Sequence, residues 1–121
     1  MKILGIETST YSGSIALADG DALTGEYFFN AGPSHTEKLV PSIDMLLSDC
    51  GVAKPDLEGI AVSLGPGSFT SLRVGISSAK ALAYALKIPV TGVSSLEVLA
   101  YNALLSERTI VPVIDARKGQ L

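Results

Sequence analysis

The chain has 121 residues, of which 47% are hydrophobic and 17% charged, a length that suits one domain and a composition that excludes a mainly disordered chain. Nine Lys and Arg against twelve Asp and Glu give a net charge of -3, which provides no overall electrostatic footprint for nucleic acid, so any RNA role is expected to be indirect. The single cysteine excludes an internal disulfide and no run approaches the roughly 20 apolar residues of a membrane span, so we expect a cytoplasmic protein without membrane contact.

The first thirty residues predict three antiparallel strands. An apolar run at 3–6 predicts the first strand, and polar residues at 7–10 follow it as a turn. Residues 14–18, with Ile15 and Leu17 on one face, predict the second strand, and residues 26–29 predict the third. Asp19, Gly20 and Asp21 have the chemistry of a hairpin turn between them.

A helix is predicted after the break at residues 31–33. Ser34 and Glu37 have the spacing of a capping box that opens a helix, and Gly51 is placed to end it. Pro41 lies inside this pattern and removes one backbone hydrogen bond, so the helix is expected to kink or restart there. The apolar residues recur at helical period: Leu39, Val40, Ile43, Leu46 and Leu47.

The remainder of the chain alternates predicted strands with predicted helices. A strand, a glycine loop and a helix form one consecutive unit in its middle. In chain order we predict a strand at 59–64, a loop at 65–70, a helix at 72–86, a strand at 89–93, a helix at 96–105 and a strand at 110–114.

The glycine loop is a candidate anion site, because backbone amides at the start of a helix can converge on a phosphate. The hydroxyl-rich turn after the first strand is a second candidate, and in both places a simple tight turn is the alternative. Gly67→Val is then expected to remove nucleotide affinity and leave the fold intact. The candidate phosphate-binding residues are Thr8, Ser9, Gly65, Gly67, Ser68, Thr70 and Arg73.

His35 is the only histidine and has no second ligand at metal spacing, so neither a metal site nor a catalytic residue is predicted.

The two long helices are the candidate partner surface. A mean hydropathy of +0.40 with few charges is high for a small monomer, and an apolar helix pair facing another protein would account for it. The alternative is that both apolar stripes face the sheet. Small residues on 72–86 would let neighbouring backbones approach closely. The candidate partner-surface residues are His35, Leu39, Ile43, Leu46, Leu47, Val74, Ile76 and Ser78.

Separate blocks along the chain resemble one family. They are Ile-Glu-Thr-Ser-Thr at 6–10, His-Thr-Glu-Lys-Leu at 35–39, Gly-Pro-Gly-Ser-Phe-Thr-Ser-Leu-Arg-Val-Gly at 65–75, Ala-Lys-Ala-Leu-Ala at 79–83, Gly-Val-Ser-Ser-Leu-Glu at 92–97 and Ile-Asp-Ala-Arg-Lys-Gly at 114–119. Together they resemble the TsaB (YeaZ) family of the bacterial tRNA threonylcarbamoyladenosine system. This resemblance implies an α/β fold of the actin, Hsp70 and sugar-kinase type (RNase H-like), with a mixed five-stranded sheet, an antiparallel strand pair and flanking helices. Residues 1–114 would form an N-terminal lobe of the actin-like ATPase type, and residues 115–121 would begin a second lobe.

The resemblance also implies a function. Members of this family pair with the catalytic paralogue TsaD, which transfers threonylcarbamoyl to adenosine 37 of tRNA, or form homodimers when alone. Ser95 and Leu99 stand where TsaD has metal-binding histidines, so the resemblance implies a non-catalytic subunit with no required cofactor. ATP or ADP, together with the ATPase TsaE, would enter only through the complex with TsaD. The alternatives are an independent ATP-binding or glycopeptidase-like (M22-type) enzyme, and a homodimer with a weak nucleotide site at 65–70.

Overall fold

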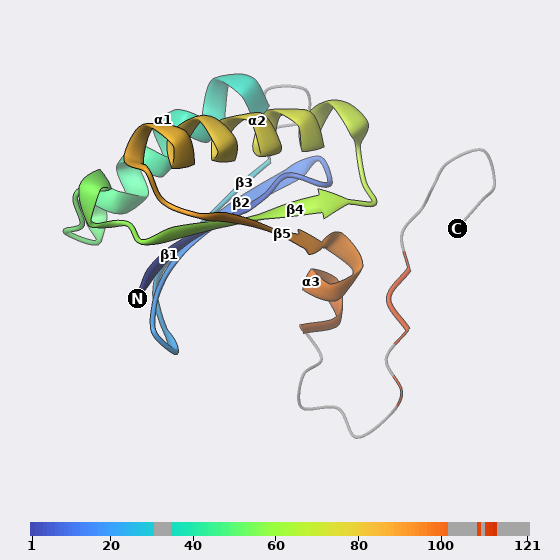
Figure 1. Cartoon of the computed structure of the whole chain (residues 1–121). Helices are drawn as coiled ribbons and strands as arrows, with labels where there is room; N and C mark the ends of the chain where they lie inside the picture. The colour runs from blue at the N-terminus through green and yellow to red at the C-terminus, as the bar shows by residue number, and fades with distance from the viewer. Residues whose placement is uncertain (31–34, 102–108, 110, 114–121) are drawn as a thin grey trace.

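A computed structural model describes residues 1–30, 35–101, 109 and 111–113, and its centre is one five-stranded sheet with the strand order β3-β2-β1-β4-β5 (Figure 1). The antiparallel strands are β1 (Lys2–Glu7), β2 (Ser12–Asp19) and β3 (Ala22–Asn30). They confirm the three predicted strands, and each is longer than predicted. Gly20 has a φ of 62° in the hairpin between β2 and β3, a backbone conformation that glycine adopts without steric cost.

The first helix, α1 (His35–Asp49), follows the predicted range and packs on β2 and β3. It runs without interruption through Pro41, so the expected restart is wrong. The proline removes only one helical hydrogen bond, and the apolar residues on both sides of it keep their period against the sheet. Gly51, with a φ of 68°, follows the end of the helix as predicted. Ser34 lies outside the described residues.

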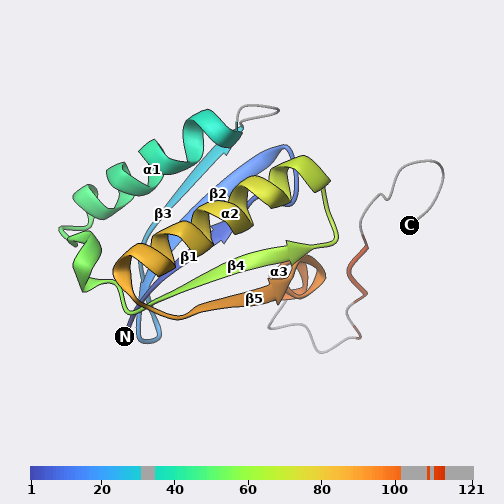
Figure 2. The same cartoon turned by 45° about the horizontal axis from the view of Figure 1, so that its top comes forward.

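The strand, loop and helix unit is also present. A short 3-10 helix, η2 (Lys54–Asp56), leads to β4 (Gly59–Gly65), which lies parallel to β1, and α2 (Phe69–Leu86) follows the glycine loop. The chain returns as β5 (Val90–Ser94), parallel to β4, and continues as α3 (Ser95–Tyr101). Figures 1 and 2 show α1 and α2 on one face of the sheet and α3 on the opposite face. The predicted mixed five-stranded α/β fold is therefore confirmed.

The C-terminal predictions differ from the structure in one place. Residues 111–113 belong to no strand, in contrast to the strand predicted at 110–114, whose first and last residues lie outside the described part. Apolar composition alone predicted that strand, and a strand also requires a neighbour with a free edge. The predicted helix at 96–105 is described as far as Tyr101, and the expected second lobe at 115–121 lies outside the described residues. None of the described helices is long and apolar enough to span a bilayer.

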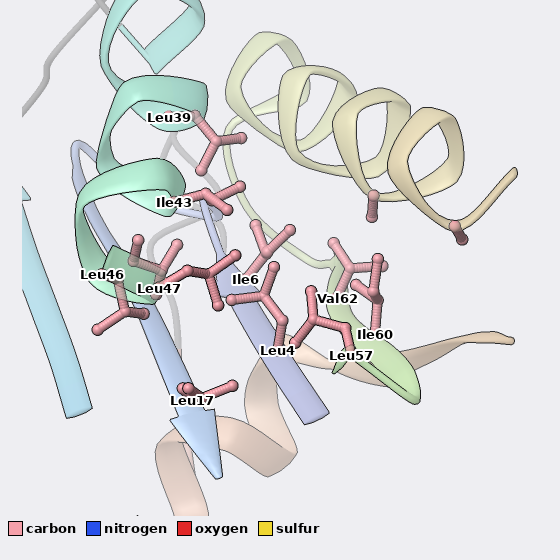
Figure 3. Packing of buried hydrophobic residues seen from close by; sticks show 13 residues of the cluster. Leu4, Ile6, Leu17, Leu39, Ile43, Leu46, Leu47, Leu57, Ile60 and Val62 are labelled. Carbon is pink, nitrogen blue, oxygen red and sulfur yellow. The ribbon is translucent and has the colours of Figure 1, made fainter. Parts of the chain in front are cut away.

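The hydrophobic core fills the space between the sheet and the helix layer (Figure 3). Alternation along β1 sends Leu4 and Ile6 to this face, where they meet the apolar stripe of α1. Leu46 is only 1% exposed, and its neighbours in the stripe are buried to the same extent. Four residues proposed for a partner surface are thus core residues, namely Leu39, Ile43, Leu46 and Leu47. The prediction that these four side chains face a partner is corrected.

Candidate functional site

The glycine loop after β4 is joined to the turn after β1. The Ser68 N–H donates a hydrogen bond of 2.7 Å to the backbone carbonyl of Ser9. A Cβ atom at Gly67 would lie 2.4 Å from that same carbonyl oxygen, which is far inside van der Waals contact. Glycine is therefore required at this position because two backbone segments meet there.

A second contact ties the end of β1 to α2. Thr8 is fully buried, and its hydroxyl donates to the backbone carbonyl of Ser71 at 2.8 Å. A Cβ atom at Gly75 would lie 2.3 Å from the Thr8 Oγ1 atom. The absence of a side chain at Gly75 thus lets α2 lie directly against the end of β1, which confirms the packing role predicted for small residues of this helix.

Glu7 organises the hydroxyl groups around the turn. One oxygen of its carboxylate, Oε1, accepts the Ser9 N–H at 2.6 Å and the Ser63 hydroxyl at 3.0 Å, and it also accepts the Ser9 hydroxyl. A carboxylate that accepts three donors holds them more firmly than a neutral acceptor would. Glu7 and Ser63 border a hollow of about 240 Å³ that Val98 of α3 also lines.

These contacts decide how the predicted phosphate-binding residues are arranged. The structure brings together Thr8, Ser9, Gly67 and Ser68, with Gly65 at the preceding end of β4. The hydroxyls of Thr8 and Ser9 already donate within the protein, and both side chains are buried, so in this conformation neither is available to an anion. The geometry matches the tight-turn alternative, and nucleotide binding stays a prediction.

Two members of the predicted phosphate-binding set belong to α2 and not to the loop before it. Thr70 and Arg73 are exposed residues of α2. The Arg73 guanidinium stands 5.3 Å from the centre of the Phe69 ring, a cation–π distance. The structure therefore places Arg73 on the helix surface, where Phe69 is its described neighbour.

The residues predicted for a partner surface differ in their exposure. Of the predicted residues not buried in the α1 stripe, Ile76 packs against the core, and the side chain of His35 lies outside the description. Val74 is partly exposed on α2 and also packs against the core, and Ser78 is partly exposed. Ser78 borders a groove of about 370 Å³ between the two helices, lined by Val40, Ile43, Asp44, Lys54, Ser77, Ser78, Ala81 and Leu82.

Sequence reasoning missed Val40, Ser77 and Ala81 as surface residues of this groove. Val40 was counted with the apolar period of α1, but it is 50% exposed. The available signal was its position directly after Leu39, which turns it by about 100° away from the buried side of the helix. Ser77 and Ala81 are small residues one turn apart on α2, and small residues gave no hydrophobic signal.

No group of three or more metal-ligating side chains forms within the part of the chain that the structure describes. Ser95 is the first residue of α3 and is 2% exposed, and Leu99, one turn later, is 43% exposed. The Ser95 hydroxyl has no hydrogen-bond partner among the described atoms. A serine is a poor metal ligand and a leucine cannot be one.

The sequence of this chain is similar to a known protein family and to several named proteins. A family model described as TsaD, tRNA N6-adenosine threonylcarbamoyltransferase, matches residues 30–121. A protein from Bacillus subtilis called tRNA threonylcarbamoyladenosine biosynthesis protein TsaB is 44% identical over 121 residues, which are 100% of this chain and 53% of that protein. The protein of the same name from Escherichia coli is 34% identical over 123 residues, again 100% of this chain and 53% of that protein.

Solved structures agree with these sequence matches. YeaZ from Pseudomonas aeruginosa superposes with a TM-score of 0.81 at 34% identity, over 88% of this chain and 49% of that one. RuvC from Thermus thermophilus has a TM-score of 0.55 at 13% identity, over 81% of this chain and 66% of that one, and this likeness concerns the fold alone. The chain spans about half the length of the curated relatives that it matches. By its family match, its relatives and its fold, the chain belongs to the TsaD-related proteins and, among them, to the TsaB (YeaZ) family.

Proposed function

We propose that this chain is a non-catalytic subunit of the machinery that makes N6-threonylcarbamoyladenosine at position 37 of tRNA, and that it pairs with the catalytic subunit TsaD. The names of the relatives support the process, because both TsaB proteins are biosynthesis proteins of this modified nucleoside. The TsaD family model supports a fold shared with the catalytic subunit, because it matches residues 30–121.

The groove between α1 and α2 is the observation on which this proposal depends. Its exposed walls combine Val40, which is 50% exposed, with the small residues Ser77, Ser78 and Ala81. Small residues let helices of a partner approach closely, and an apolar side chain contributes favourable burial. Two helices with a groove between them are suited to receive another helix pair in a four-helix arrangement.

Related lobes favour pairing through equivalent surfaces. An interface with two-fold symmetry uses the same patch on both partners. Because TsaD and this chain match over the region that contains α1 and α2, the two proteins can meet through corresponding helix pairs about a pseudo-two-fold axis. The same surface on a second copy of this chain would form the homodimer that we expect in the absence of TsaD.

The chemistry of α3 supports a non-catalytic role. Ser95 and Leu99 lie one helical turn apart, as two metal ligands on one helix face would, but neither side chain is a useful ligand. We therefore assign metal chemistry to TsaD. ATP or ADP, and the ATPase TsaE, are proposed to act in the assembled complex, and we propose that this chain requires no cofactor of its own.

An independent ATP-binding or glycopeptidase-like enzyme is the alternative. The described contacts give it less support, because the Ser68 amide and the Thr8 hydroxyl are already used inside the protein. A nucleotide would have to displace the hydrogen bond between Ser68 and Ser9 before reaching that amide. We expect no ATP affinity from the chain alone.

The experiment measures the affinity of this chain for its cognate TsaD by isothermal titration calorimetry. Ala81→Glu places a charge in the exposed groove and is expected to weaken binding by at least tenfold, since an interfacial charge without a partner is costly. Leu23→Glu is the matched control, because Leu23 is 61% exposed on β3, a strand that does not line the groove. Unchanged affinity of the Ala81→Glu variant, with the fold intact by circular dichroism, would contradict the proposed surface.

A further inference from the structure

The outer flank of α2 carries a regular line of basic residues. Arg73, Lys80 and Lys87 are spaced by seven residues, nearly two turns of a helix, so they follow one line about 21 Å long. Lys87 occupies the C-cap of the helix. The 18 residues of α2 include no Asp or Glu. This helix therefore presents only positive charge, although the chain as a whole has a net charge of -3.

Lys80 and Lys87 of the basic line lie on the side of the helix away from the partner groove, whereas Arg73 borders a hollow together with Ser77 and Ser78, which also line the groove. Lys80, Tyr84 and Lys87 border a shallow hollow beside Val90 of β5, whereas the partner groove lies on the side of α1. The sheet order explains this separation, since α1 packs on β2 and β3 while α2 packs on β4 and β5 (Figure 2). A partner seated in the groove leaves the β5 flank of α2 available.

No carboxylate neutralises these three cations within the described part of the chain. Two other lysines are paired, Lys2 with Asp19 at 3.7 Å and Lys54 with Asp44 at 2.6 Å. Neither Arg73, Lys80 nor Lys87 forms such a pair among the described residues, and all three are exposed. Their charge is therefore available to a ligand from outside the domain.

Exposed aromatic rings accompany the basic line. Tyr84 lies one turn beyond Lys80 and is 89% exposed, and Phe69 lies one turn before Arg73 and is 73% exposed. Rings exposed to this degree contribute little to the stability of the domain. Next to cations, they provide the stacking platforms that proteins use for unpaired bases.

We propose that this flank of α2, namely Phe69, Arg73, Lys80, Tyr84 and Lys87, binds single-stranded RNA, with the cations on phosphates and an unpaired base stacked on Tyr84. The inference rests on the proposed function, which supplies tRNA as the RNA. It replaces the expectation of a purely indirect RNA role, because that expectation used the charge of the whole chain and took no account of its distribution. An acidic protein would satisfy the cations equally well, but it would have less use for two exposed rings in the same line.

The test measures binding of a fluorescent anticodon stem-loop with an unpaired loop adenosine, by anisotropy, to the chain alone and to its complex with TsaD. Three phosphate contacts predict that affinity of the chain falls about 20-fold between 50 and 200 mM salt. Arg73→Glu, Lys80→Glu and Lys87→Glu together are expected to remove this salt dependence in the chain alone. Lys80→Glu alone is expected to weaken binding clearly more than Lys38→Glu, a matched change of an exposed lysine on α1.

A second pair of variants tests the base contact. Tyr84→Ala is expected to weaken RNA binding about fivefold or more. Phe28→Ala, which removes a ring that is 75% exposed on β3, is expected to leave it unchanged. The proposal is overturned by an unchanged salt slope in the triple variant. It is equally overturned if Tyr84→Ala has no effect and polyglutamate competes as well as RNA, because the flank would then be a docking surface for an acidic protein.

Changes of the same residues separate this inference from the proposed function. The double variant Lys80→Glu with Lys87→Glu is expected to keep full affinity for TsaD, because both lysines lie outside the groove and border the hollow beside β5. Normal pairing with unaltered RNA binding would overturn only the RNA surface. Failure of the unmodified chain to pair with TsaD would overturn only the proposed function, since the RNA measurement on the chain alone does not depend on pairing.

Discussion

The backbone carbonyl of Ser9 accepts a hydrogen bond from the Ser68 N–H at 2.7 Å, and this bond joins two loops that lie 59 positions apart in the sequence. It connects the turn after β1 with the loop that leads from β4 into α2. A loop composition typical of anion binding is used here to hold a strand end against a helix start.

Gly67→Ala is expected to lower the free energy of unfolding by about 1–3 kcal/mol, because the added methyl group would meet the Ser9 carbonyl at 2.4 Å. The neighbour is backbone and cannot move aside by changing a rotamer. Urea unfolding measures the effect, with Gly5→Ala as the control, since a Cβ there has its nearest atom at 3.8 Å. Equal stability of the two variants would contradict the close approach. The sequence-based expectation that Gly67→Val leaves the fold intact is corrected on the same ground.

Gly75→Ala is expected to reverse the usual effect of this substitution. In an ordinary helix the change stabilises by roughly 0.5–1 kcal/mol. Here the new Cβ would lie 2.3 Å from the Thr8 Oγ1 atom, so we expect a loss of about 1–3 kcal/mol in thermal or urea unfolding. Combined with Thr8→Ala, the same change is expected to cost less than it does alone. A stabilising effect of Gly75→Ala in the unmodified background would contradict this packing.

Glu7→Ala is expected to destabilise the protein by about 1–3 kcal/mol, because the Ser9 and Ser63 donors would lose their common acceptor in a largely buried position. Glu7→Gln keeps an oxygen of similar position and is expected to cost less. Urea unfolding of both variants gives the comparison. If the glutamine variant were as unstable as the alanine variant, the hydrogen-bond role assigned to Oε1 would be wrong.

Leu46→Glu is expected to unfold the chain, because Leu46 is 1% exposed and a buried charge without a partner is very costly. Met45→Glu changes the adjacent residue, which is 58% exposed, and is expected to keep the fold. Circular dichroism distinguishes the two variants directly. A folded Leu46→Glu variant that fails to pair with TsaD would instead restore the original prediction that Leu46 faces a partner.

Local patterns predicted most of the fold. The alternation of Ile15 and Leu17, the turn at Gly20 and the end of α1 at Gly51 depend on neighbours in sequence, and the structure confirms all three. The strand predicted at 110–114 is not found at 111–113, the residues of this range that the structure describes, because an apolar run specifies neither a pairing partner nor a free edge.

The candidate site was less predictable, because it depends on contacts between distant segments. The bond between Ser9 and Ser68, and the contact of Thr8 with Ser71, have no signature within a short window of sequence. Four of the five residues assigned to the apolar stripe of α1 are buried and Val40 is not, and periodicity does not say whether a stripe meets a sheet or another protein. Burial in the folded domain settled that question for Leu39 and its neighbours.

The claim that this chain pairs with TsaD can be checked by size-exclusion chromatography with light scattering. The chain alone is expected to elute as a homodimer. Addition of cognate TsaD is expected to convert it to a heterodimer containing one copy of each protein, which the Ala81→Glu variant fails to form. Two separate peaks with unchanged masses, obtained with folded proteins, would contradict the claim.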